Sequence, residues 1–512
     1  MSLPPRHLLA GPLCILAVVV VCGCGSGAPD HPNVLLITLD TVRADHLGSY
    51  GHPKEITPNL DRLARQGTRF ETAISTSAVT PVSHASILTG RNPYAHGLRV
   101  IFADGGFRLE KSVPTLASVL RAAGYRTGAA LSSFTVSGYF GLDRGFDFFD
   151  GFETSLLKRE SSGFRNWDTV KSQRRADATT GSAIAFLAAG KGPFFLWVHY
   201  WDMHDVLKLP DEAFMPPPTE LKFSSSGNLM QSPALYAAEI RFVDHHLGRL
   251  LEALGQRGLE EGTLIAVVSD HGQGLGDHGW FGHQILYQEQ IRVPLLLRIP
   301  GVAGGREVKE LVRSIDLLPT LLDYAGLPLP KGVQGRSLRP LMEGREDSPR
   351  LAYADQLNLF DKNARMILRR PWDDLLYSVQ DQGWKLIYRP TRPEHSELYN
   401  LAQDPAEAEN LFRFDHEHAR RLLARLGEHD GWLRQPPRGA TVDPEARKRL
   451  AALGYVEEEE EKKKETRSRP PIAWSYTAAA DFGHQHFSTS DDCVAETHSP
   501  CVLVRRPRDG SP

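Results

Sequence analysis

Two apolar segments that each end in an acidic residue constrain the fold of this chain most. Val34–Leu39 is followed directly by Asp40, and Leu264–Ser269 is followed by Asp270 and His271. Apolar runs of this length are typical of parallel strands that are buried on both faces. Ligands of open α/β sheets bind just beyond the carboxyl ends of the strands. We therefore predict that these polar residues meet at one sheet edge and bind a metal; the alternative is that the two acids only cap turns.

Composition sets the broad class of the protein. The chain has 512 residues, of which 41% are hydrophobic and 24% are charged, so it can bury a large core. The formal net charge of -3 gives no electrostatic reason to expect a nucleic acid as partner. Twenty histidines fit metal or proton chemistry without proving either.

Residues 1–29 have the pattern of an export signal, with basic residues before the apolar span Leu8–Cys22. The span is too short to favour a permanent transmembrane helix. The segment Val21–Cys24 resembles the processing site of bacterial lipoproteins, with Cys24 as the lipid-bearing residue and Cys22 as the second candidate. We expect export to the periplasm or cell envelope with a lipid anchor in the membrane; cleavage without lipid is the alternative.

The remaining cysteines bear on the redox chemistry of the body. Cys493 and Cys501 lie near the end of the chain, and no cysteine occurs between residues 25 and 492. The body is therefore expected to contain neither a disulfide nor a thiolate site.

Strand-like and helical segments alternate over residues 30–344. Helices are predicted over 57–67, 114–124 and 232–258, and strands over 127–131, 194–200 and 293–299, besides the two acid-tipped strands. This alternation predicts an α/β fold with a doubly wound sheet and helices on both faces. Residues 345–456, with short strands over 384–389 and 397–399 and a helix over 415–433, predict a smaller C-terminal α+β subdomain. Residues 457–512 begin with a charged run and are predicted to be mostly disordered.

A further motif lies between the two acid-tipped strands. Thr80–Arg91 reads Thr-Pro-Val-Ser-His-Ala-Ser-Ile-Leu-Thr-Gly-Arg. Together with Asn33–Gly51, Ser269–Gly272 and Leu398–Pro405, it resembles the sulfatase family of the alkaline-phosphatase superfamily, and the motifs occur in the family's order. The resemblance covers roughly residues 32 to 456 and implies an alkaline-phosphatase-like, mostly parallel doubly wound sheet.

The resemblance also implies a position for the nucleophile. The family pattern is Cys-x-Pro-x-Arg, followed by Leu-Thr-Gly-Arg, and its cysteine is converted to formylglycine. Alignment on Leu88–Arg91 places Thr80 at the nucleophile and His84 at the arginine, with Pro81 one place early. Without a cysteine here, the protein cannot be a formylglycine enzyme. Threonine is the nucleophile in other branches of the superfamily; the alternative is that Thr80 only caps a helix and the site is inactive.

The family's metal pocket uses two acids after the first strand and an Asp-Asn pair after the later one. This chain has Asp40-Thr41 and Asp270-His271 at these places. We predict one divalent ion held by Asp40, Asp270, His271 and Thr80. Carboxylate and imidazole ligands favour zinc or manganese, whereas the family resemblance leaves calcium or magnesium open.

Three further histidines are candidate catalytic and substrate-binding residues by resemblance. His204 matches a family histidine that contacts the transferred group and is a candidate general acid. His283 falls where the family often has a substrate-binding lysine, and His84 could contact the same group. Asp202, together with His204 and His283, is a weaker candidate for a second ion. The remaining motif residues are interpreted as structural: His96, His199, Asp277 and His278.

The resemblance implies hydrolysis of a sulfate ester or a phosphate or phosphonate ester carried by a small molecule or a glycan. Similarity of fold does not determine the substrate, so sulfur and phosphorus both stay open. Two other functions compete: an envelope transferase of phosphoryl groups, and a catalytically silent, lipid-anchored anion-binding protein. The sequence does not determine the oligomeric state.

Overall fold

The computed structural model describes residues 31–101, 108–152, 172–204, 209–223, 229–361 and 364–429. The predicted export signal, the lipid site at Cys24 and the predicted disordered tail lie outside these residues. Within the described ranges, no helix is both long and apolar enough to cross a membrane.

The predicted α/β fold is confirmed by a mixed, mostly parallel central sheet. Its strand order is β12-β2-β11-β8-β1-β5-β3-β4, and β13 also pairs with β2. β1 (Asn33–Leu39) lies between β5 (Phe194–Tyr200) and β8 (Thr263–Ser269), parallel to both. β11 (Arg292–Arg298) is antiparallel to β8 and to β2. The other strands are β2 (Thr68–Ile74), β3 (Arg126–Leu131), β4 (Phe148–Asp150), β12 (Arg306–Val308) and β13 (Val312–Arg313).

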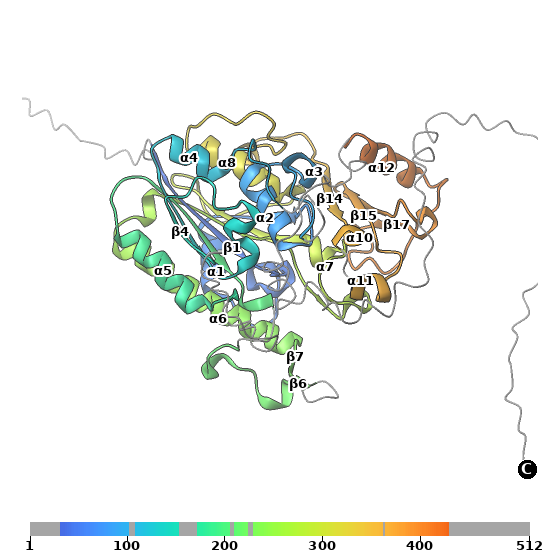
Figure 1. Cartoon of the computed structure of the whole chain (residues 1–512), viewed down its shortest axis with the longest axis horizontal. Helices are drawn as coiled ribbons and strands as arrows, with labels where there is room; N and C mark the ends of the chain where they lie inside the picture. The colour runs from blue at the N-terminus through green and yellow to red at the C-terminus, as the bar shows by residue number, and fades with distance from the viewer. Residues whose placement is uncertain are drawn as a thin grey trace, which may run out of the picture. The chain divides into compact units, whose positions relative to one another are not determined.

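Helices cover both faces of this sheet, because each buried strand has apolar side chains on both sides. Leu36 of β1 packs in one core cluster, whereas Leu35 and Ile37 pack in the other. Figure 1 shows α4 and α8 above the sheet and α5 and α6 below it. The upper layer contains α2 (Thr80–Thr89), α4 (Leu116–Ala122) and α8 (Leu317–Tyr324); the lower contains α1 (Pro58–Gln66), α5 (Ala176–Ala188) and α6 (Pro233–Gln256).

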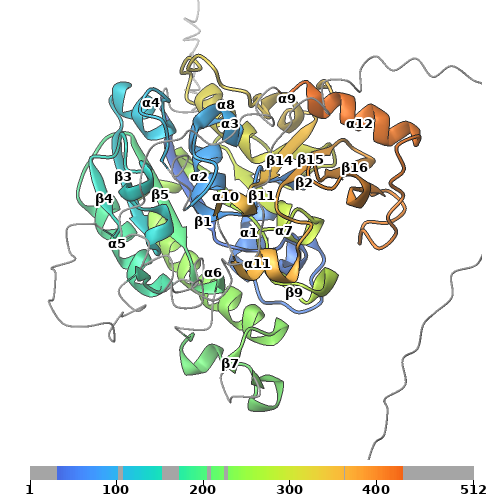
Figure 2. The ribbon, with the colours of Figure 1, turned by 45° about the vertical axis from the view of Figure 1, so that its right-hand side comes forward.

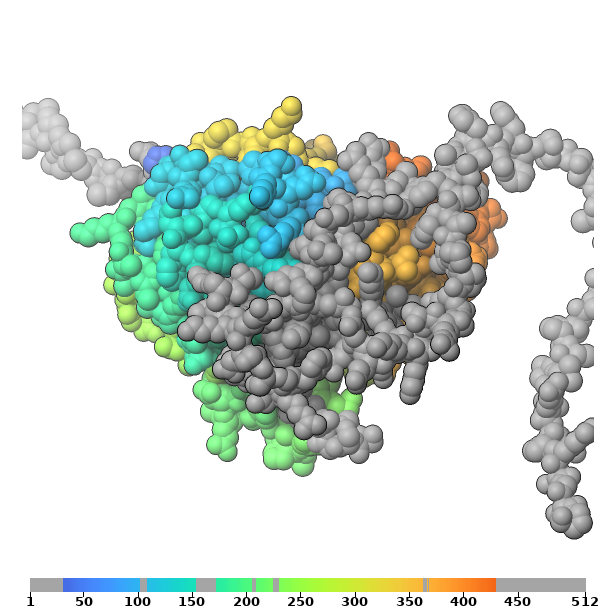
Figure 3. Space-filling view, in the orientation of Figure 1, coloured from blue at the N-terminus to red at the C-terminus, as the bar shows by residue number. Residues whose placement is uncertain are grey.

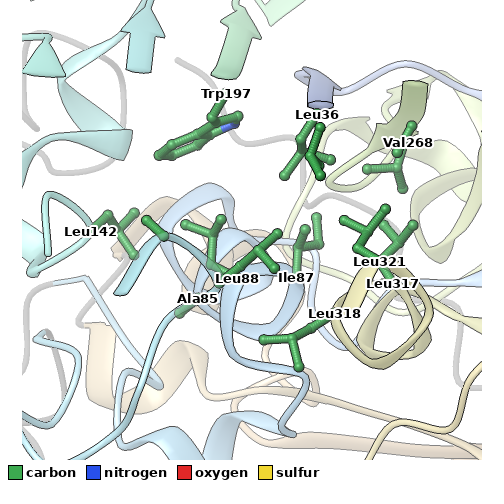
Figure 4. Packing of buried hydrophobic residues seen from close by; sticks show 14 of the residues in the cluster. Leu36, Ala85, Ile87, Leu88, Leu142, Trp197, Val268, Leu317, Leu318 and Leu321 are labelled. Atoms are coloured by element: carbon green, nitrogen blue, oxygen red, sulfur yellow. The ribbon is translucent and has the colours of Figure 1, made fainter. Parts of the chain in front are cut away.

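Helix α2 is enclosed on all sides, and every one of its residues is buried. Figure 4 shows Ala85, Ile87 and Leu88 of this helix facing side chains of the sheet and of α8. These contacts place the start of α2, and with it Thr80, in a fixed position over the sheet.

Two of the helices begin at a side-chain cap. Ser232 and Thr115 accept hydrogen bonds from the first turns of α6 and α4. Thr57 occupies the N-cap position of α1, and Pro58 begins the helix, but the Thr57 hydroxyl accepts from the backbone N–H of Gly48 at 3.0 Å and donates to the Asp61 side chain instead of capping the helix backbone. Thr57 therefore joins α1 to the loop that follows β1.

The smaller α+β unit is also present. Figure 2 shows β14, β15 and β16 beside α12 on the right. The sheet is antiparallel in the order β14-β15-β16-β17. Its elements are β14 (Ala352–Gln356), β15 (Leu376–Gln380), β16 (Trp384–Tyr388), β17 (Glu397–Asn400) and α12 (Glu417–Gly427). The helix is shorter than the predicted 415–433 and ends at a glycine, which has poor helix propensity.

The short elements lie mainly in connections. They are α3 (Pro93–His96), α7 (Gln288–Ile291), α9 (Arg339–Met342), α10 (Asn358–Asp361), α11 (Ala364–Arg369), β6 (Lys222–Phe223), β7 (Leu229–Met230), β9 (Gly274–Leu275) and β10 (Phe281–Gly282). In the space-filling view of Figure 3, the blue to cyan segments, which include α4, form much of the upper left-hand surface, and the orange C-terminal elements lie to the right. All described residues belong to one compact unit. The exact domain boundaries stay a prediction.

Candidate active site

The structure brings the three predicted metal ligands of the sheet together. The register pairs Leu39 with Ser269, so β1 and β8 end side by side. Asp40, Asp270 and His271 each offer a ligand atom, and these atoms all lie within 4.8 Å of one another. All three residues are fully buried. The sequence pattern of two acid-tipped strands therefore has the geometry that we predicted for it.

The surroundings of Asp270 fit a cation. Its Oδ1 accepts hydrogen bonds from the backbone N–H groups of His271 at 2.7 Å and Thr41 at 3.1 Å. Its Oδ2 is buried and accepts no hydrogen bond from the described residues, although His84 Nδ1 lies 3.5 Å away. Burial raises the pKa of Asp270, and attraction to His84 opposes that rise. Because a buried carboxylate is costly unless it is paired or binds a metal, this atom supports a cation at the site.

Thr41 holds this arrangement through an unusual backbone conformation. Its φ of 57° is in the left-handed region, which is unfavourable for a β-branched residue. Tyr236 Oη of α6 donates to the carbonyl of Thr41 at 2.6 Å and accepts from the N–H of Arg43 at 3.0 Å. Tyr236 thereby fixes the turn that directs the N–H of Thr41 toward Asp270. Sequence analysis missed this role because no local pattern shows the strain.

Thr80 faces the same cluster from the first position of α2. Val79 occupies the N-cap position, so the alternative that Thr80 only caps the helix is wrong. Thr80 Oγ1 lies 3.3 Å from His271 Nε2. His271 Nδ1 lies 2.9 Å from the carbonyl of Gly272, and a carbonyl only accepts, so Nδ1 carries the proton. Burial lowers the pKa of His271 to about 4, which leaves a neutral ring with an Nε2 lone pair toward the hydroxyl.

His204 and His283 form a pair beside this hydroxyl-imidazole contact. Their Nε2 atoms lie 3.2 Å apart, and the His283 ring centroid is 4.7 Å from that of His271. His283 Nδ1 donates to the carbonyl of Ala78 at 2.8 Å, so its Nε2 is the acceptor and His204 Nε2 is the donor. Burial lowers the pKa of both rings, and His204 stacks on Trp201 at 3.8 Å. The pair holds one proton between two facing nitrogens.

His84 and His199 complete the row of buried histidines. His84 Nδ1 donates to the carbonyl of Thr80 at 2.8 Å, and its Nε2 has no hydrogen-bond partner among the described residues. His199 Nε2 lies 3.2 Å from Asp40 Oδ2. The ring centroids of His84 and His199 are 5.0 Å apart. The interpretation of His199 as merely structural missed this contact. Only the neighbouring position of β5 and β1 reveals it, and no sequence signal gives that neighbour.

The weaker candidate for a second ion does not have the required geometry. Asp202 Oδ1 accepts from the N–H of Ala176 at 3.1 Å and lies 3.3 Å from Arg175 Nη2. Burial raises its pKa to about 6. Among the described residues, the groups of three or more candidate ligands within 4.8 Å of one another do not include Asp202. Its contacts indicate a structural role in the turn that leads to His204.

The remaining histidine and aspartate assignments are mixed. His96 Nε2 lies 3.0 Å from Ser86 Oγ, and Asp277 forms a 2.6 Å ion pair with Arg43, as structural residues would. His278 instead lies in a second group of candidate ligands with Glu289 and Glu407. Lys385 Nζ is 2.7 Å from Glu407, so a buried ammonium group already supplies positive charge there.

The chain is an α/β protein with a buried carboxylate-histidine cluster at the carboxyl edge of its sheet, and comparison with known proteins gives the family. The sulfatase family model matches residues 32–327, more than half of the chain, and the model for the C-terminal region of N-sulphoglucosamine sulphohydrolase matches residues 276–429. The chain belongs to the sulfatase family, whose members hydrolyse ester bonds and depend on a metal.

Individual relatives and solved structures share between 22% and 28% of their residues with this chain over the aligned regions. The N-acetylglucosamine-6-O-sulfatase of Bacteroides thetaiotaomicron is 23% identical, covering 78% of this chain and 86% of that protein. The arylsulfatase of Clostridium perfringens is 28% identical, covering 74% and 90%. The solved phosphonate monoester hydrolase of Agrobacterium radiobacter superposes with a TM-score of 0.61 at 22% identity, covering 78% of this chain and 95% of that chain. The structural likeness confirms the alkaline-phosphatase-like fold.

Proposed function

We propose that this protein hydrolyses sulfate esters or phosphate-type esters with Thr80 as the nucleophile. One observation carries the proposal: Thr80 Oγ1 lies 3.3 Å from Nε2 of His271, beside two buried carboxylates. An alcohol is a weak nucleophile until a neighbouring group lowers its pKa or accepts its proton. A cation bound by the cluster would lower the pKa of the hydroxyl, and where no ion occupies Nε2 of His271 that nitrogen can accept the proton instead.

The metal ligands in this proposal are Asp40, Asp270, His271 and Thr80. The carboxylate and imidazole donors suit zinc or manganese by ligand preference, and family membership leaves calcium and magnesium open. A bound divalent ion would lower the pKa of the hydroxyl and neutralise charge on the ester group.

The protein's own residues supply the remaining steps. Thr80 Oγ bonds to the sulfur or phosphorus atom as the bond from that atom to the leaving oxygen breaks. The leaving oxygen needs a proton, and the His204–His283 pair holds one at a 3.2 Å contact. Burial keeps both rings neutral in the free protein, but an anionic ester placed against them favours a protonated imidazole. Water then attacks sulfur or phosphorus and the bond from that atom to Thr80 Oγ breaks. One proton of the water returns to Oγ, and the sulfate or phosphate-type anion leaves with the water oxygen.

The nucleophile favours phosphorus over sulfur within this reaction class. A threonine ester can be cleaved only by water at the heteroatom, which is ordinary for phosphoryl enzymes and less so for sulfuryl enzymes. The names of the relatives include both chemistries, with an N-acetylglucosamine-6-O-sulfatase and a phosphonate monoester hydrolase among them. We propose a small-molecule or glycan ester as the substrate, and an exported protein that carries a lipid at Cys24.

A panel of esters tests this function. Protein without residues 1–24 is given nitrophenyl sulfate, phosphate, phosphodiester and phosphonate, with calcium, manganese and zinc tried in turn. We expect metal-dependent turnover of at least one ester that Thr80→Ala abolishes and Thr80→Ser partly retains. Metal binding measured on Thr80→Ala by competition with a chelating dye separates loss of the nucleophile from loss of the pocket.

Two results would reject the proposal in favour of its competitors. Absence of turnover in the parent protein, with metal and anion still bound, would support a catalytically silent anion-binding protein. Transfer of the phosphoryl group to an added alcohol in preference to water would support the transferase.

A further inference from the structure

One edge of the central sheet lies opposite the candidate active site. Asn33 pairs with Thr263, and Val34 pairs with Phe195, so β1, β5 and β8 all begin at this amino edge. These strands are seven residues long, and at about 3.3 Å per residue the two edges lie about 23 Å apart. Asp40 and Asp270 mark the other edge.

The described chain begins at this amino edge. The ring of His31, two residues before β1, lies 6.4 Å from the ring of Tyr125, the residue before β3. Cys24 precedes Asn33 by nine positions, and nine extended residues reach about 30 Å. A lipid on Cys24 therefore allows a membrane to lie directly against the amino edge, whereas a membrane at the candidate active site would use about 23 Å of this reach only to pass the sheet.

The amino edge also carries exposed positive charge. Arg62 and Arg65 lie in the last two turns of α1, Lys191 precedes β5, and Arg257 follows α6. All four side chains are exposed and form no ion pair with a described residue. A hollow of about 590 Å³ between α1 and α6, lined in part by Arg62, opens here.

Acidic residues at the same edge are fewer and partly neutralised. Glu252 and Glu260 line the hollow, and Glu261 is exposed nearby. Glu261 pairs with Arg298 at 3.0 Å, and Glu260 lies 4.0 Å from the same guanidinium group. Unpaired cations thus outnumber unpaired acids, which suits the negative surface of a bilayer that contains anionic lipids.

We propose that the amino edge lies on an anionic lipid surface and that the candidate active site opens away from the bilayer. The inference rests on the lipid attachment at Cys24 in the proposed function. The linker leads into the amino edge, and the exposed cations hold that edge against lipid phosphates. In this orientation the ester comes from a soluble molecule or an extended glycan, and the head groups of the anchoring leaflet lie out of reach of Thr80.

Fluorescence quenching on vesicles tests the orientation. Full-length lipidated protein with Cys493→Ser and Cys501→Ser receives one labelled cysteine, either Gln66→Cys at the amino edge or Phe281→Cys on the β9–β10 hairpin. Gln66 and Phe281 are both exposed, and the hairpin lies between His271 and His283 in the chain. In vesicles of phosphatidylethanolamine and phosphatidylglycerol with a lipid-borne quencher, we expect the label at residue 66 to be quenched several-fold more.

Charge variants test the role of the exposed cations. Arg65→Glu with Lys191→Glu should reduce quenching at residue 66 and make it less sensitive to salt. Arg392→Glu with Arg420→Glu is the matched control, because both arginines are exposed in the C-terminal subdomain and form no ion pair with a described residue. Equal loss of quenching in the control would overturn the role of these cations.

Three other results would overturn the orientation. These are equal or stronger quenching at residue 281, mass spectrometry showing no lipid on Cys24, and energy transfer between residue 66 labels on two copies, which would assign the edge to a dimer. The assay needs no turnover, so an inactive protein would reject the proposed reaction and leave the orientation tested.

Discussion

Replacing Asp270 by asparagine should stabilise the metal-free protein while abolishing its response to metal. Burial raises the pKa of Asp270 from 3.8 to about 6, against the attraction of His84. The folded protein therefore holds this proton more tightly than the unfolded chain does. The folding free energy that this tighter proton binding contributes is fully present below pH 3.8 and is lost as the pH rises through 6.

The structure sets the size of the expected effect. A pKa rise from 3.8 to about 6 corresponds to about 3 kcal/mol of folding free energy lost at neutral pH. Asparagine is neutral and keeps an oxygen that can accept from the N–H groups of Thr41 and His271, so the variant avoids this cost. We expect metal-free Asp270→Asn to be more stable than the parent by up to about 3 kcal/mol at pH 7.5, with the difference gone near pH 3.5.

Metal should reverse the order of stability. An ion at a thousand times its dissociation constant stabilises the folded parent by about 4.1 kcal/mol, whereas the variant lacks a ligand and should gain little. Urea unfolding of both proteins, in chelator and with added zinc or manganese across pH 3.5 to 8, measures each quantity. A metal-free variant that is less stable than the parent at pH 7.5 would refute the reasoning, because Asp270 would then stabilise the fold as a structural acid.

Three further substitutions test the support of the site. Leu88→Ala removes a fully buried side chain of α2 and should lower the free energy of unfolding by about 3 kcal/mol in urea unfolding. Tyr236→Phe leaves the carbonyl of Thr41 unpaired and should cost about 1–3 kcal/mol and weaken metal binding, measured by dye competition. Glu239→Gln weakens the 3.0 Å contact to Arg175, which in turn contacts Asp202 in the turn that leads to His204. We expect kcat, measured by steady-state kinetics, to fall about 10-fold because His204 is less well positioned, with metal affinity unchanged. A fall in metal affinity would contradict this positioning role.

Much of the architecture follows from local pattern. Continuous apolar segments predict buried strands, and the residue that directly follows a strand must lie at its carboxyl edge. Asp40, Asp270 and His271 could therefore be placed together before their distances were known. Alternation of strands and helices gives the fold class for the same reason, since period and order along the chain are local properties.

Tertiary structure decides which elements are neighbours and how side chains turn. β5 lies beside β1 although more than 150 residues separate them, and this neighbour brings His199 against Asp40. The left-handed turn at Thr41 and the contact of His204 with His283 likewise depend on packing between distant segments. The sequence by itself determines the apolar period of each segment. The free energy that selects strand order, strained turns and rotamers comes from tertiary contacts, which form only when the complete core is packed.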